Sequence, residues 1–229
     1  MAMINDMESF YSNNNSFTHD VYTVNLHGNK IKVTVTAAAS VVKKWINAAL
    51  CFRRRYMIPQ NRLIVGLGVQ WTPDGRDPPA DTLQLCIGNR CLIFQLAHAN
   101  YVPRSLRRFL ENPYYTFVGF WNHSDRLKLK SSDQRLEMYK DPVDLRHYAQ
   151  AEYDEDDDED GDLARASVEE IVEKCLGYEI EQSGEIAISD WDDKVLSDKQ
   201  VVYASIDAYC AFRIGKNVKA WSLSKLIAW

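Results

Sequence analysis

The chain has 229 residues, of which 46% are hydrophobic and 26% charged, with a net charge of −5; this is globular composition, with enough length for one sizeable core. No apolar run reaches the roughly 18 residues that a membrane helix needs, and residues 1–20 lack the basic segment and apolar core of a secretory signal. Five cysteines without a Cys-x-x-Cys pair favour reduced thiols, so we expect a protein of the nucleus, the cytoplasm or both, not secreted and not in a membrane.

The first third of the chain predicts a flexible end, a hairpin and a helix. Residues 1–18 are rich in Asn and Ser and are expected to be flexible. Apolar and polar residues alternate in 21–26 and in 31–35, which predicts a β-hairpin at a sheet edge with its turn at 27–30. An apolar stripe at helical spacing predicts a helix over 37–56.

Three strands are predicted next. Residues 63–71 are almost continuously apolar, which indicates a strand covered on both faces at the centre of a mixed sheet. Two more strands are expected at 82–87 and 91–96, where Cys86 and Cys91 would face each other.

A helix, a strand and a second helix follow. A proline begins the short helix predicted at 103–111, and residues 115–121 read as another buried strand. Asn122 or Ser124 can cap the next helix, which places Asp125 in its first turn, where an acid is favoured.

The C-terminal part predicts two helices and two unusual segments. A Ser-x-x-Glu capping box begins the helix at 167–176, and the last long helix is expected at 197–216. Residues 152–162 hold nine acids and no base, so the rest of the chain carries +4; such a block predicts a disordered loop. Residues 218–229 form an apolar tail, which leaves 19–217 as one α/β domain with helices on both faces of its sheet.

The chemistry gathers at the ends of these elements. Tyr203 and Asp207 are four residues apart and share one helix face, where a carboxylate and a phenol can hold a metal ion and orient a water. Asp125 supplies a second carboxylate. Gly68 and Gln70 point to one side of the central strand near its carboxyl end, where open α/β sheets place their sites.

These segments resemble, in order, the motifs of the DEDDy 3′→5′ exonucleases, the group that contains RNase D and the Werner-syndrome-type exonuclease domains. Residues 65–71 (VGLGVQW) are similar to the first motif, 125–129 (DRLKL) to the second, 142–146 (PVDLR) to the segment beyond it, and 203–209 (YASIDAY) to the third. The resemblance implies an RNase H-like α/β fold of the 3′→5′ exonuclease type, with a central mixed β-sheet flanked by helices.

The resemblance also implies a metal site and its decay. The family holds two Mg²⁺ or Mn²⁺ ions with four carboxylates; Asp125 and Asp207 match two of them, and Tyr203 matches the residue that orients the attacking water. The first motif should read Asp-x-Glu, where this chain has Gly68 and Gln70. Glycine offers no ligand and an amide is a poor ligand for Mg²⁺, so we expect weak or absent metal binding. Glycine at 68 can alternatively mark the close approach of another backbone or of a ligand.

Basic residues give candidates for contacts with nucleic acid, with a solvated charged face as the alternative. The candidates are Arg104, Arg107, Arg108, Arg126 and Lys128. Against catalysis, Glu185 and Ala187 stand where Werner-type sequences usually carry basic residues.

Together these features predict a 3′→5′ exonuclease-like protein with impaired or absent catalysis that binds single-stranded or 3′-end nucleic acid, or a protein partner. One alternative is a weakened but active metal-dependent 3′→5′ exonuclease. The other is a pure protein-interaction module that uses the acidic block at 152–162 or the apolar tail at 218–229.

Overall fold

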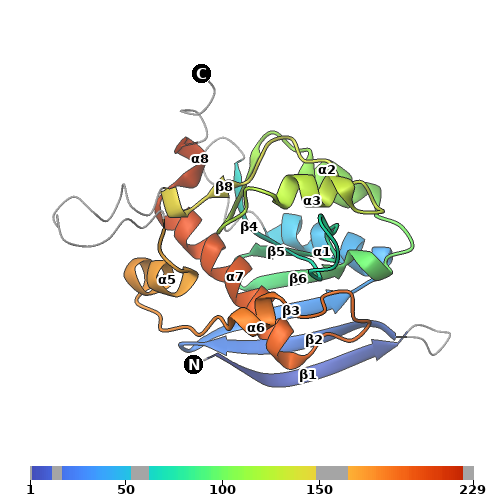
Figure 1. The fold of residues 1–229 in the computed structure, drawn as a ribbon, viewed down its shortest axis with the longest axis horizontal. Helices are drawn as coiled ribbons and strands as arrows, with labels where there is room; N and C mark the ends of the chain where they lie inside the picture. The colour runs from blue at the N-terminus through green and yellow to red at the C-terminus, as the bar shows by residue number, and fades with distance from the viewer. Residues whose placement is uncertain (1, 12–16, 53–61, 148–164, 224–229) are drawn as a thin grey trace.

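A mixed β-sheet forms the centre of the computed structural model, which describes residues 2–11, 17–52, 62–147 and 165–223 (Figure 1). Within these ranges the sheet has eight strands in the order β1-β2-β3-β6-β5-β4-β7-β8. The strands are β1 (Met3–Tyr11), β2 (Phe17–Leu26), β3 (Asn29–Thr36), β4 (Leu63–Gln70), β5 (Thr82–Ile87), β6 (Arg90–Gln95), β7 (Tyr115–Gly119) and β8 (Val143–Asp144). The neighbours of β4 are antiparallel β5 and parallel β7, so the predicted mixed sheet and the inner position of this strand are confirmed.

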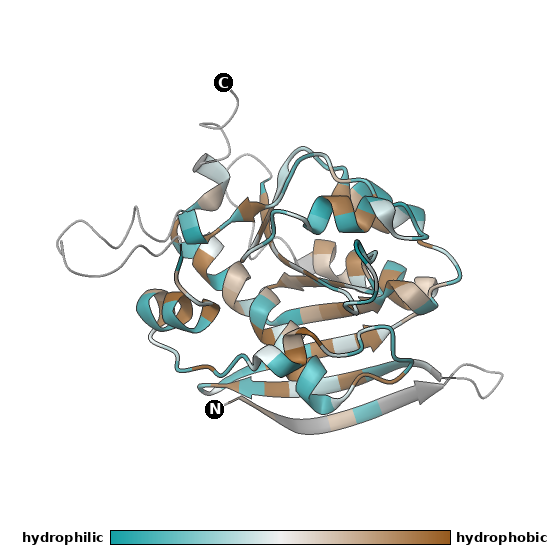
Figure 2. Ribbon diagram, viewed as in Figure 1, coloured by the Kyte–Doolittle hydropathy of each residue, from teal (hydrophilic) through white to brown (hydrophobic). Residues whose placement is uncertain are grey.

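Helices cover both faces of the sheet. They are α1 (Ala39–Phe52), the 3-10 turn η2 (Leu96–His98), α2 (Arg104–Leu110), α3 (Asp125–Ser131), α5 (Val168–Leu176), α6 (Gly184–Ala187), α7 (Asp198–Asn217) and α8 (Ala220–Leu223). One hydrophobic core joins α1 and α2 to one face, and a second core joins α5 and α7 to the other. Figure 2 shows hydrophobic residues along the inner strands and on the helix sides that face them.

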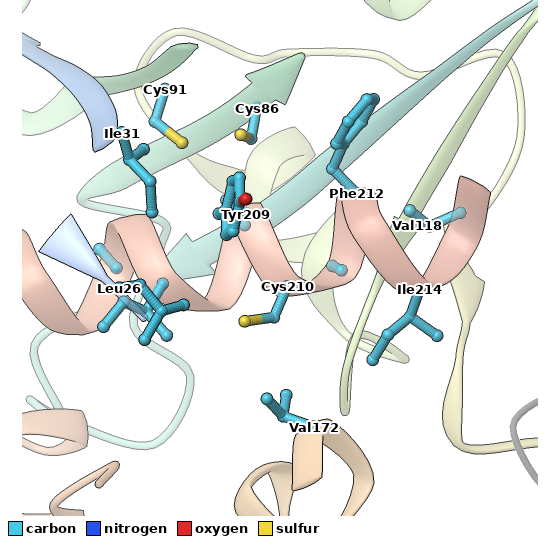
Figure 3. Close-up of a cluster of buried hydrophobic side chains, with 14 of the residues drawn as sticks. Leu26, Ile31, Cys86, Cys91, Val118, Val172, Tyr209, Cys210, Phe212 and Ile214 are labelled. Atoms are coloured by element: carbon cyan, nitrogen blue, oxygen red, sulfur yellow. The ribbon is translucent and has the colours of Figure 1, made fainter. Parts of the chain in front are cut away.

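Two glycines bring α7 directly onto the sheet. A β-carbon on Gly66 of β4 would stand 1.8 Å from the carbonyl oxygen of Ala208, and one on Gly215 would stand 2.8 Å from a methyl group of Val118. Figure 3 shows α7 between the sheet and α5, the helix that carries Val172. Tyr209 lies near Cys86 of the sheet, and Cys210 points toward α5. This close packing fixes where α7 presents its polar residues.

The capping box predicted at Ser167 is confirmed, whereas Ser124 precedes α3 without a side-chain cap hydrogen bond. The Ser167 hydroxyl accepts a hydrogen bond from the Glu170 backbone N–H, and the Glu170 carboxylate accepts one from Ser167 N–H at 2.7 Å. The same reciprocal box, formed by Ser197 and Gln200, begins α7. These caps satisfy backbone donors that have no partner inside the helix.

The N-terminal segment differs from its prediction. The predicted hairpin is present as the antiparallel pair β2 and β3. However, Met3–Tyr11 forms β1, which pairs antiparallel with β2, so the edge of the sheet is β1 and not the hairpin. The backbone groups on the outer side of β2 pair with β1. The composition of the N-terminal segment does not reveal this pairing. Residues 12–16, the acidic block at 152–162 and residues 224–229 of the predicted tail lie outside the described residues.

Cys86 and Cys91 are direct partners on β5 and β6, as predicted, and all five cysteines are free thiols. None of the helices in the described ranges is long and apolar enough to cross a bilayer.

Candidate nuclease-like site

The candidate site lies where the carboxyl ends of β4 and β7 meet α7. Gly66 faces Ala208 of α7, and alternate residues of a strand share one side, so Gly68 and Gln70 also face the α7 side of the sheet. The two positions where the resemblance requires carboxylates are therefore in the place that the sequence predicted. Neither supplies a carboxylate.

The space beside Gly68 is filled by a neighbouring side chain. Gln84, the direct partner of Gly68 on β5, is fully buried, and its Oε1 lies 2.9 Å from where a β-carbon on Gly68 would stand. The Gln84 Nε2 donates to the Thr82 hydroxyl at 2.7 Å, whereas its Oε1 has no hydrogen-bond partner. The group that closely approaches Gly68 is thus the side chain of Gln84. The close approach of another backbone occurs at Gly66, which meets the carbonyl oxygen of Ala208.

Asp207 is held by an amide on the α7 side. Gln182 Nε2 donates to Asp207 Oδ1 at 2.5 Å and to the Tyr203 carbonyl at 3.3 Å. Burial raises the pKa of the Asp207 carboxyl to about 7, against the lowering effect of the Gln182 hydrogen bond, and Glu169 of α5 raises it further. A carboxyl with this pKa is partly protonated near neutral pH.

Tyr203 lies one turn before Asp207, as its spacing predicted. Its ring packs against Trp191 with 6.0 Å between ring centroids and 54° between their planes. Burial, then Asp207 and then Glu169 raise the pKa of the phenol, so it stays protonated and can donate a hydrogen bond at neutral pH.

Asp207 lies near enough to Asp125 for its negative charge to raise the pKa of the Asp125 carboxyl. Asp125 is buried at the start of α3, and burial raises its pKa well above the usual range; the negative charges of Asp144 and then Asp207 raise it further. Asp144, on β8, belongs to the quoted segment 142–146 but was not predicted as a site residue. It pairs with Arg146 at 2.6 Å.

The residues present do not fit a pair of Mg²⁺ or Mn²⁺ ions. Gly68 offers no ligand, Gln70 offers an amide, and the Gln182 amide occupies one oxygen of Asp207. In the part of the chain that the structure describes, no three His, Cys, Asp or Glu side chains are placed to hold a metal ion.

Lys128, one of the predicted nucleic-acid contacts, is engaged within the protein. Its side chain is buried, and its ammonium lies 2.7 Å from Asp77 Oδ1, 2.6 Å from the Pro78 carbonyl oxygen and 4.9 Å from the centre of the Trp71 ring. The loop after β4 therefore binds this lysine. A contact between Lys128 and a phosphate stays a prediction, and it would require the ammonium to leave these partners.

The predicted arginines are not gathered beside α7. Arg126 pairs with Asp141 at 3.5 Å, and Arg107 donates to the carbonyl of Gln134 at 2.7 Å. Arg104 and Arg108 are exposed on α2, which packs on the face of the sheet opposite α7. Any role in binding nucleic acid remains a prediction for these four residues.

Comparison with known proteins establishes the class. Residues 80–220, more than half of the chain, match the family model described as 3′-5′ exonuclease. The chain therefore belongs to the 3′-5′ exonuclease family, of the DEDDy type that its motifs resemble. Positions 68 and 70 precede the matched range.

The relatives include larger proteins. The chain is 24% identical over 175 residues to the bifunctional 3′-5′ exonuclease/ATP-dependent helicase WRN of Mus musculus, covering 71% of this chain and 12% of that protein. It is 26% identical over 160 residues to a 3′-5′ exonuclease of Arabidopsis thaliana, covering 68% of this chain and 52% of the relative. The chain thus spans about half or less of these relatives.

Solved structures agree on the fold. The EXO domain of Nibbler from Aedes aegypti superposes with a TM-score of 0.61 at 14% identity, over 84% of this chain and 89% of that one. Escherichia coli RNase D, an exoribonuclease involved in structured RNA processing, gives a TM-score of 0.58 at 14% identity, over 81% and 44%. The RNase H-like 3′-5′ exonuclease fold predicted from the motifs is confirmed.

Proposed function

We propose that this protein is a 3′-5′ exonuclease-like domain with little or no catalysis, which binds a nucleic-acid strand at its degenerate site. The observation that carries the proposal is the carboxyl end of β4, where Gly68 and Gln70 face α7 and the Gln84 amide fills the space beside Gly68. Two-metal catalysis requires two ions that stabilise the attacking and the leaving oxygen. Loss of a single electrostatic stabiliser costs about 10³-fold in rate, and here two ligands are replaced.

A weakened exonuclease is the second candidate, and the remaining carboxylates favour it. Asp125 lies close enough to Asp144 and Asp207 for their charges to raise its pKa. A single metal ion held by these remaining carboxylates would give slow, metal-dependent cleavage. The two candidates differ in whether cleavage occurs at all and whether it depends on Asp207.

A cleavage assay separates them. The protein is incubated with end-labelled single-stranded and 3′-recessed substrates in Mg²⁺ and in Mn²⁺, with Asp207→Ala as the matched control. The proposal predicts no cleavage above that control. Slow metal-dependent cleavage that is lost in Asp207→Ala would support the weakened exonuclease instead. Cleavage at about 1 s⁻¹ or faster, the usual range of enzymes, with the same loss would overturn both in favour of a fully active nuclease.

Binding is measured separately with the same strands at several salt concentrations. Contacts to phosphates predict an affinity that falls linearly with salt on logarithmic axes. If no strand binds at low salt, the nucleic-acid proposal is wrong, and a protein-interaction role is the reading to pursue.

A further inference from the structure

Trp121 combines exposure with an unusual backbone conformation beside the candidate site. It follows the end of β7 by two residues, 46% of its surface is exposed, and its φ is +49°. A bulky residue in the left-handed region is uncommon and costs energy, and such positions concentrate at functional sites. An exposed indole therefore stands at a place where a turn residue such as glycine would suit the backbone better.

The loop that carries the indole is fixed on both sides. The neighbouring Asn122 side chain is buried and donates to the Val143 carbonyl at 3.1 Å, and Asn122 O accepts from the Asp125 N–H at 3.1 Å. The Leu145 N–H donates to the Gly119 carbonyl at 2.9 Å. The ring is therefore presented by a rigid backbone, which lowers the entropy that a ligand must remove on binding.

Arg146 supports one face of the ring. Its guanidinium carbon lies 3.5 Å from the centre of the Trp121 ring, and the guanidinium is itself held by both oxygens of Asp144, with Nε at 3.0 Å from Oδ1 and Nη2 at 2.6 Å from Oδ2. Only 9% of the Arg146 side chain is exposed. Because one ring face is covered, the exposed surface of Trp121 belongs to the other face and the edges.

The supported ring stands next to the degenerate site. Asp144, which clamps Arg146, also raises the pKa of Asp125 through its negative charge, after the larger effect of burial, and Trp121 precedes Asp125 by four residues. We therefore expect a strand end bound at Asp125 to come close to the exposed part of the indole.

We propose that Trp121, supported by Arg146, is a stacking platform for an unpaired nucleobase of a single-stranded nucleic acid. Stacking on an aromatic face is tolerant of sequence, and a guanidinium on the opposite face strengthens the aromatic surface. Arg146 is engaged by Asp144, so its function here is to hold the ring and not to bind phosphate. The inference rests on the proposed function and names the residue that contacts the bases.

The test compares a fluorescein-labelled oligo(dT) with an abasic strand that has the same number of phosphates, by fluorescence anisotropy at fixed salt. Wild type is expected to bind oligo(dT) roughly 5- to 150-fold more tightly than the abasic strand, the range expected for one stacked base. Trp121→Leu removes that preference, and Trp121→Phe keeps part of it. Tyr114→Leu is the matched control, since Tyr114 is also an exposed aromatic residue, 62% against 46% for Trp121, but precedes β7 at the opposite end of the strand.

The outcomes separate the two proposals. If wild type binds no strand, both fail. If wild type binds oligo(dT) and Trp121→Leu binds it equally well, or if Tyr114→Leu weakens binding as much, the platform is wrong while nucleic-acid binding stands. Circular dichroism and thermal unfolding confirm that each variant is folded, and Trp121→Phe keeps the test informative if Trp121→Leu is not.

Discussion

The amide oxygen of Gln84 lies 2.9 Å from the point where a β-carbon on Gly68 would stand. Gln84 is fully buried, and this oxygen has no hydrogen-bond partner. The obstruction is the end of a flexible side chain, whereas at Gly66 it is the backbone carbonyl of Ala208. A side chain can therefore be restored at position 68 if Gln84 moves, without moving α7.

The first prediction follows from that contact. Gly68→Asp with Gln70→Glu should create weak Mn²⁺ binding and slow cleavage, and adding Gln84→Ala should strengthen both, because the new carboxylate no longer competes with the amide for space. Ligands of one site act as a unit, so each single change should do less than the pair. Isothermal titration with Mn²⁺ and the strand-cleavage assay measure the two effects.

Gln84→Ala alone is the control and should not gain metal binding, since it adds no ligand. Equal metal affinity in the double and triple variants would show that Gln84 rotates away at no cost. A folded triple variant without any metal binding would mean that Asp125 and Asp207 no longer stand in a usable arrangement.

Most of the fold was predictable because its signals are local. The capping boxes at Ser167 and Ser197 and the apolar run of β4 each occupy one short stretch of chain. Strand β1 was missed because its stability comes from pairing with β2, and the polar composition of 1–18 outweighed the weak alternation within it.

The site was predictable only where one motif carries it. Tyr203 and Asp207 share a helix face, so their spacing placed them together. Gln182 contacts Asp207 from a segment without regular structure, and only tertiary folding brings it there. The burial of Lys128 could not be predicted, because the sequence shows only a charge on a helix, whereas Asp77 and Pro78, which bind it, are 51 and 50 residues away.

The second prediction concerns pH. The folded pKa of Asp207 is about 7 against an ordinary value of 3.8, so the folded state binds this proton more tightly than the unfolded state. Its stabilising contribution is complete below about pH 4 and is lost as the pH rises through about 7. The loss is at most a few kcal/mol, since one pKa unit corresponds to about 1.4 kcal/mol.

Asp207→Asn tests this, because the amide oxygen can still accept from Gln182 and no longer ionises. Urea unfolding at several pH values should show the variant more stable than wild type at pH 8, with a smaller decline in the free energy of unfolding between pH 4 and pH 7. Asp133→Asn, which neutralises an exposed acid, serves as the control. Equal slopes for Asp207→Asn and wild type would contradict the raised pKa.

The third prediction is that Lys128 contributes to stability, unlike an exposed lysine on the same helix. Lys128→Met keeps the aliphatic stem but leaves the Pro78 carbonyl without its donor, so it should lower the free energy of unfolding by about 1–2 kcal/mol. Its effect on oligonucleotide affinity should not exceed that of Lys130→Met, a change on the same helix at a side chain that is 61% exposed. A larger loss of affinity in Lys128→Met than in Lys130→Met would show that Lys128 contacts the strand.

The last prediction concerns the acidic block at 152–162, whose nine acids repel nucleic acid over about 10 Å at 0.1 M salt. Its deletion should preserve folding and raise strand affinity at low salt, with the gain disappearing at high salt, because the rest of the chain carries +4. A variant of equal length with serine at the nine acidic positions separates charge from length and should match the deletion.

Unfolding of both variants would mean that the block is structural. Unchanged affinity would mean that the block lies far from the binding face or that the protein does not bind strands; the apolar tail at 218–229, with Trp221 and Trp229, is then the first surface to test for a protein partner.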